Sequence, residues 1–105
     1  MRRWALAAAL LALPFAGAPA AAAPATYTVV IEKMKFGPLP ANLHAGDTIV
    51  WVNRDMFLHS ATARDGSFNV NLPPRTSARS IVPRKGAVAF FCRYHPGMTG
   101  VLQAR

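Results

Sequence analysis

Proline and glycine interrupt this chain of 105 residues often, since it contains nine prolines and seven glycines. No segment after residue 25 shows a convincing helical period. Between the interruptions lie short runs rich in β-branched and aromatic residues, of which Thr48–Asn53 is the clearest. Short strands separated by frequent turns are typical of sandwiches. We therefore predict an all-β fold, an antiparallel Greek-key β-sandwich.

The expected strands end at turn signals such as Ala45-Gly46-Asp47, Arg64-Asp65-Gly66 and the hairpin connection Pro83-Arg84-Lys85-Gly86. In chain order, we expect strands at Thr26–Lys33, Thr48–Asn53, His59–Ala63, Ser67–Leu72, Thr76–Val82, Ala87–Cys92 and Thr99–Ala104, with a short edge segment at Asn42–Ala45. Together they account for one small domain.

The first 23 residues have the features of a cleavable secretory signal. Arg2 and Arg3 supply a positive start, and Trp4–Leu13 is an apolar core too short to span a bilayer. An alanine- and proline-rich stretch with small-x-small cleavage sites follows. We expect residues 1–23 to be a signal peptide and residues 24–105 to be a periplasmic domain. The alternative is an uncleaved membrane anchor.

The charge of the remaining chain is positive. Without Arg2 and Arg3, ten Lys and Arg residues stand against four Asp and Glu residues. The positive charges are scattered singly and form neither a run nor a helical stripe, which argues against nucleic acid as a partner. Such an excess favours association with an acidic protein surface or a negatively charged membrane surface.

Cys92 is the only cysteine, so it has no disulfide partner within the chain. His95 and Met98 follow it at intervals of three residues. A thiolate, an imidazole and a thioether at this spacing can bind one ion, and the soft sulfur ligands favour copper over zinc, calcium or magnesium. A blue copper site needs a second histidine, and His59 is available upstream. The alternative is a buried, inert cysteine.

The alternation of residues in Ala87–Cys92 predicts where the thiol points. Val88 and Phe90 share a face with Cys92, while Phe91 lies on the other face. If the bulkier stripe packs in the core, the sulfur points inward at the end of the strand. We then expect His95 and Met98 on the loop that follows, a loop-borne site held by a rigid scaffold.

These motifs resemble those of the cupredoxins, the small blue copper proteins, and most closely their amicyanin-like branch with its short Cys-x-x-His-x-x-Met loop. The resemblance covers nearly the whole chain after the signal peptide, including Met34-Lys35-Phe36, Val50-Trp51-Val52-Asn53 and Phe90-Phe91-Cys92. It implies a cupredoxin domain at residues 24–105. It also implies one type 1 copper ion. The three strong ligands would be His59, Cys92 and His95, and the long axial ligand would be Met98.

Two residues are expected to brace this site. Asn53 is expected to make a hydrogen bond that orients the ligand loops. In amicyanin-like proteins an asparagine commonly follows the first ligand histidine and ties the ligand loops together. This chain has Ser60 there, which can bridge them with a shorter reach. Tyr94 and Gly97 also depart from amicyanin, so its partner is not carried over.

A copper ion with these ligands changes geometry little between Cu(I) and Cu(II), which suits electron transfer. We predict a monomeric periplasmic electron shuttle, not an enzyme, that forms transient complexes with acidic redox proteins. The docking surface is expected around the edge of His95, at Pro96, Met56, Phe57, Leu58 and Arg93. One rival is a carrier that supplies or buffers copper. Another is a thiol enzyme using Cys92 and His95, which an inward-pointing thiol disfavours.

Overall fold

The computed structural model describes residues 23–105, so the predicted signal peptide lies outside the described residues except for Ala23. Eight strands form in this part of the chain, and none of its segments is a helix that could cross a membrane. The strands are β1 (Thr26–Glu32), β2 (Lys35–Phe36), β3 (Thr48–Asn53), β4 (His59–Ala63), β5 (Asn69–Leu72), β6 (Ser77–Ile81), β7 (Gly86–Cys92) and β8 (His95–Ala104).

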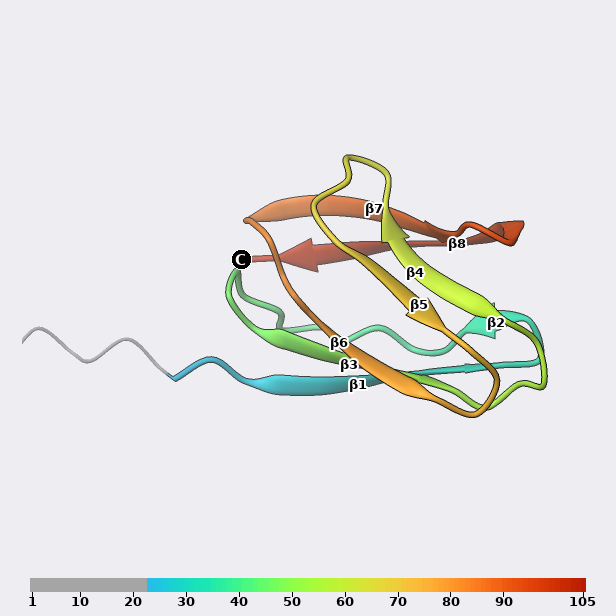
Figure 1. The fold of residues 1–105 in the computed structure, drawn as a ribbon. Helices are drawn as coiled ribbons and strands as arrows, with labels where there is room; N and C mark the ends of the chain where they lie inside the picture. The colour runs from blue at the N-terminus through green and yellow to red at the C-terminus, as the bar shows by residue number, and fades with distance from the viewer. Residues whose placement is uncertain (1–22) are drawn as a thin grey trace, which may run out of the picture.

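The strands form two four-stranded sheets that lie face to face (Figure 1). One sheet has the order β2-β1-β3-β6, and the other has the order β5-β4-β7-β8. The predicted all-β sandwich is confirmed, and β3 and β4 occupy the predicted residues. The edge segment expected at Asn42–Ala45 makes a single bridge, between Leu43 and Ala104, and does not extend into a strand.

One strand pair departs from the predicted antiparallel arrangement. β1 and β3 pair in parallel, from Thr26 opposite Thr48 to Ile31 opposite Asn53. Parallel neighbours need a long crossover. The chain makes one here by turning back through β2, which pairs with the end of β1, and then returning along the sandwich in residues 37–47. The short β2 hairpin was not predicted.

An aromatic cluster fills the space between the sheets. Trp51 of β3 and Phe90 of β7 are fully buried, with ring centroids 5.1 Å apart. Phe36 packs edge-on against both rings. The indole N–H of Trp51 donates to the hydroxyl of Ser80 (2.8 Å) on β6, so the buried polar atom is satisfied. Phe90 therefore fixes the strand that carries Cys92 two residues later.

The Phe90 ring lies so close to β8 that Gly100→Ala should destabilise the fold. A Cβ at residue 100 would lie 2.8 Å from Phe90 Cε1, inside van der Waals contact with a fully buried ring. Overpacking of this kind costs about 1–3 kcal/mol, measured as the free energy of unfolding of the metal-free protein in urea. Gly97→Ala is the control, because a Cβ there has no neighbour within 4 Å and should change stability by about 0.5 kcal/mol at most. Equal stability of the two variants would contradict this packing.

Candidate metal centre

Four strand ends meet at one end of the sandwich, at the right in Figure 1. β3 ends there at Asn53 and β4 begins at His59. β7 ends there at Cys92, which pairs with His95 at the start of β8. This convergence brings together side chains that are more than thirty residues apart in the sequence.

Three ligand atoms converge at this end. The candidate donor atoms of His59, Cys92 and His95 all lie within 4.8 Å of one another. Cys92 Sγ is 3.8 Å from His59 Nδ1 and 3.6 Å from His95 Nδ1. Metal bonds of about 2.0 Å to nitrogen and about 2.3 Å to sulfur, at tetrahedral or trigonal angles, separate such atoms by about 3.5–3.7 Å. The observed separations therefore fit a single bound ion.

Burial differs among the ligand candidates. His59 and Cys92 are fully buried, as the alternation of residues along β7 predicts for Cys92. Met98 is also buried and belongs to the same hydrophobic cluster as Cys92. His95 is only partly buried, so it is the most exposed of the four ligand candidates.

His95 and Met98 lie on a strand, so their predicted position on a loop is wrong. Only Arg93 and Tyr94 form the turn between β7 and β8. The register shifts between Phe91, which faces Thr99, and Cys92, which faces His95. Three extra residues of β8, including Pro96 and Gly97, bulge between these pairs. In a sequence, proline and glycine usually indicate a loop. They are also common at bulges in strands, where the ladder of hydrogen bonds is interrupted, so the sequence alone did not distinguish the two.

Ser60 joins the two segments that carry the ligands. Its backbone N–H donates to Cys92 Sγ (3.4 Å), and its hydroxyl accepts from the backbone N–H of Arg93 (2.9 Å). The hydroxyl also bonds to Thr62 Oγ1 (3.0 Å). These bonds hold the Cys92 sulfur and the backbone that follows it against the strand that carries His59.

The chain matches a family model for the cupredoxin-like domain over residues 4–104. It belongs to the cupredoxins. Amicyanin from Paracoccus versutus is 34% identical over 91 residues, which cover 78% of this chain and 69% of that protein. The crystal structure of amicyanin from the same organism superposes with a TM-score of 0.64 at 26% identity, covering 76% of this chain and 81% of that one.

A purple cupredoxin from Nitrosopumilus maritimus shares the fold, with a TM-score of 0.63 at 18% identity over 75% of this chain and 99% of that one. The resemblance stated from the ligand motifs is therefore confirmed. Cupredoxins are copper electron-transfer proteins, and the thiolate, two imidazoles and thioether at this end of the sandwich are arranged as a type 1 copper site.

Asn53 holds the segment that leads to the first histidine of this cupredoxin. Its amide N–H groups donate to the carbonyl oxygens of Phe57 (2.8 Å) and Leu72 (3.0 Å). Its amide oxygen accepts from the backbone N–H of Asp55 (2.9 Å). Asn53 is almost completely buried, and these bonds join the loop at residues 54–58 to the end of β5.

Sequence reasoning missed Asp55, whose carboxylate contacts His59. Asp55 Oδ2 lies 2.8 Å from His59 Nε2, and the carboxylate also accepts from the backbone N–H groups of Lys33 and Met34. Burial alone would raise the pKa of Asp55, but the hydrogen bonds from His59, Met34 and Lys33 outweigh it and lower the pKa below its ordinary value. The chain has only four acidic residues, and one of them lies four positions before a predicted ligand histidine. That position was the sequence signal that could have identified Asp55.

The turn between the ligand strands is also tied to β5. Tyr94 Oη donates to Asn71 Oδ1 (2.7 Å), and the Arg93 guanidinium lies 5.3 Å from the centroid of the Tyr94 ring. Sequence reasoning noted Tyr94 as a departure from amicyanin but not this contact, because nothing local pairs residue 94 with residue 71.

Exposed apolar side chains lie in the segment next to His95. Met56, Phe57 and Leu58 are 69%, 58% and 36% exposed. The Phe57 ring centroid lies 6.5 Å from that of His95. Arg93 and Pro96, which lie before and after His95 in the sequence, are also exposed. The structure places Met56–Leu58 on the surface, where a docking surface requires them.

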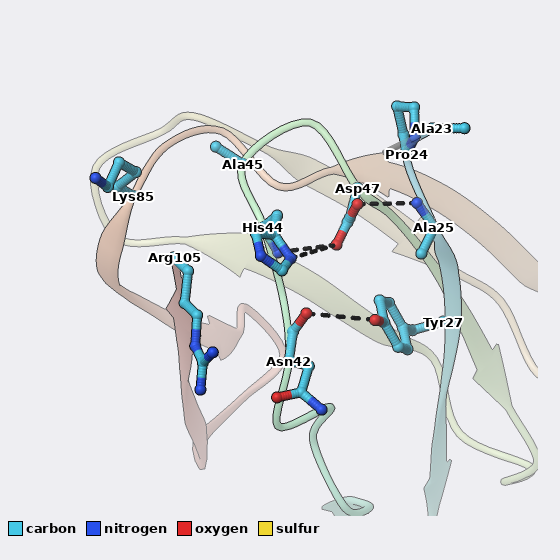
Figure 2. A pocket seen from close by; sticks show the side chains of 10 residues that line it. All are labelled: Ala23, Pro24, Ala25, Tyr27, Asn42, His44, Ala45, Asp47, Lys85 and Arg105. Atoms are coloured by element: carbon cyan, nitrogen blue, oxygen red, sulfur yellow. Dashed lines mark hydrogen bonds and ion pairs between the residues drawn. The ribbon is translucent and has the colours of Figure 1, made fainter. Parts of the chain in front are cut away.

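A pocket lies at the opposite end of the sandwich, among residues before β1, β3 and β7 and at the end of β8 (Figure 2). His44 lines it and is exposed, as expected for a histidine outside the metal centre. The backbone N–H groups of His44 and Ala25 donate to Asp47, and these bonds hold the pKa of that carboxyl below its ordinary value. The contacts fasten the start of β1 to the turn before β3, and none of the copper-ligand candidates lines this pocket.

Proposed function

We propose that this cupredoxin is a periplasmic electron carrier that binds one copper ion through His59, Cys92, His95 and Met98. The convergence of Cys92 Sγ with the Nδ1 atoms of both histidines supports this most directly. When bound, copper supplies a one-electron couple. The predicted signal peptide at residues 1–23 supports the periplasmic location.

The surroundings of the site favour electron transfer over catalysis. Ser60 and Asn53 fix both ligand segments with buried hydrogen bonds, so little rearrangement accompanies a change of charge. His59 and Cys92 are fully buried, which excludes water and substrates from that side. Electrons then have a short route to the surface through the edge of His95.

The same burial disfavours both rival functions. A copper carrier must release its ion to a partner, whereas the Cys92 sulfur has no exposed surface through which a receiving ligand can attack. A thiol enzyme needs a thiolate that its substrate can reach. A carrier of electrons needs neither.

Optical and electrochemical measurements on the purified, copper-loaded protein test this proposal. We expect an intense visible band from charge transfer between the Cys92 sulfur and Cu(II), and a reversible one-electron wave. A copper-loaded protein without that band contradicts the site. Rapid loss of copper to a soluble Cu(I) chelator, with the band present, would instead favour the carrier function.

Docking is proposed to occur at the apolar patch Met56–Leu58 with Pro96, next to Arg93. Transient redox contacts are small, so a patch of this size suffices. We expect Phe57→Ser to slow electron transfer to an acidic haem protein by about tenfold, the effect of losing about 1.4 kcal/mol at the contact. Stopped-flow mixing measures the rate.

Ile81→Ser is the matched control for that variant. Ile81 is 55% exposed, close to the value for Phe57, but it pairs with Thr48 at the other end of the sandwich. Its replacement should leave the rate unchanged. The rate of the unmodified protein should fall as salt rises, and Arg93→Gln should weaken that dependence. Equal slowing by Phe57→Ser and Ile81→Ser would place docking elsewhere.

A further inference from the structure

The turn between β1 and β2 has an unusual backbone. Lys33 and Met34 connect Glu32 to its partner Lys35, and their φ angles are 53° and 61°. Two consecutive residues with positive φ make a type I′ hairpin turn, which usually contains asparagine, aspartate or glycine. A lysine and a methionine adopt this conformation only when surrounding contacts hold it.

Asp55 provides such contacts. Its Oδ1 accepts from the N–H of Lys33 (2.7 Å) and its Oδ2 accepts from the N–H of Met34 (3.0 Å). The backbone N–H of Asp55 is held in turn by Asn53 Oδ1. Hydrogen bonds therefore fix both the carboxylate and the backbone of Asp55, and the side chain is only 13% exposed.

The fixed carboxylate decides which nitrogen of His59 carries a proton. An ionised carboxylate only accepts hydrogen bonds, so the 2.8 Å contact places a hydrogen on His59 Nε2. With Nε2 occupied by this hydrogen bond, Nδ1 is the ring nitrogen whose lone pair is available to a metal. Nδ1 is the atom that lies 3.8 Å from Cys92 Sγ, so the nitrogen left free is the one that faces the metal centre.

We propose that Asp55 is a positioning residue of the copper site, which holds His59 with Nδ1 toward the metal and whose negative charge favours Cu(II) over Cu(I). The inference rests on the proposed function. A carboxylate bonded to a ligand histidine makes the ring a stronger donor. The more highly charged ion gains more from the nearby negative charge, so Asp55 lowers the reduction potential.

Asp55→Asn tests the proposal with nearly the same shape and no charge. We expect the affinity for Cu(II) to fall by tenfold to hundredfold, the usual effect of losing such a partner. Cu(I) should be affected less. A tenfold larger loss for Cu(II) than for Cu(I) corresponds to an upward shift of about 59 mV in the one-electron potential. Voltammetry and the visible spectrum measure these changes.

Asp65→Asn is the matched control. Asp65 also accepts from a backbone N–H, that of Ser67 (2.9 Å), and pairs with Arg84 (2.9 Å), but it lies in the turn between β4 and β5, outside the group of ligand candidates. Its replacement should leave the potential unchanged. Equal shifts from both variants would make the effect one of net charge and overturn the proposal. So would reduced stability of Asp55→Asn with an unchanged potential, because Asp55 would then be purely structural.

A measurement on the unmodified, metal-free protein covers the case in which Asp55→Asn does not fold. ¹⁵N-edited NMR should show a slowly exchanging hydrogen on His59 Nε2 and none on Nδ1. The opposite tautomer would overturn the proposal whatever the variant does. Because this readout needs no copper, it separates failure of the Asp55 role from failure of the proposed function, which a missing visible band in the unmodified protein would show.

Discussion

Cys92→Ser is expected to abolish the intense visible absorption of the copper-loaded protein while the sandwich remains folded. The band needs a thiolate, and Cys92 is the only cysteine in the chain. A serine hydroxyl is a hard, neutral donor that does not replace it. The serine still has partners in the metal-free protein, since the N–H of Ser60 points at this position. Absorption spectroscopy and circular dichroism check the two parts of the prediction.

His44→Ala is the control for the loss of colour. It removes a histidine from the opposite end of the sandwich, where the side chain is exposed. The band should keep its position and intensity in this variant, change in His59→Ala, which loses one ligand but keeps the thiolate, and disappear in Cys92→Ser. A blue Cys92→Ser protein is incompatible with the proposed ligand set.

The orientation of Cys92 was predictable because it depends on local geometry. Successive residues of a strand point to opposite faces, so the large Val88 and Phe90 place Cys92 in the core wherever β7 lies in the fold. The strand Thr48–Asn53 was predictable for a similar reason, since its β-branched run has one buried face. Membership of the cupredoxins followed from ligand spacing, which is also a local property of the chain.

What the sequence did not predict depends on contacts between distant segments. The bond between Asp55 and the turn at Lys33–Met34 requires β1 and β3 to be parallel neighbours, and no local pattern specifies that pairing. The contact of Tyr94 with Asn71 depends in the same way on β5 lying beside β4. The start of β8 at His95 was missed because its bulge contains Pro96 and Gly97.

Asn53→Ala is expected to be the most destabilising single substitution near the site. It leaves the carbonyl oxygens of Phe57 and Leu72 and the N–H of Asp55 without their partner. The bond to Leu72 is buried and the other two are partly buried. An unsatisfied buried group costs about 1–3 kcal/mol, so the free energy of unfolding should fall by about 2 kcal/mol or more. Urea unfolding of the metal-free protein measures it. Asn42→Ala, at an exposed position, should have little effect.

Asn53→Asp separates the hydrogen bonds from the volume of the side chain. It keeps the acceptor for the N–H of Asp55 but places a carboxylate oxygen against the two carbonyl oxygens. Since donors are replaced by an acceptor in a buried position, the loss of stability should equal or exceed that of Asn53→Ala. An Asn53→Asp protein as stable as the unmodified one would show that side-chain shape holds residues 54–58 in place. The expected loss of stability would instead show that residues 54–58, which lead to His59, are held in place by hydrogen bonds that Asn53 must donate.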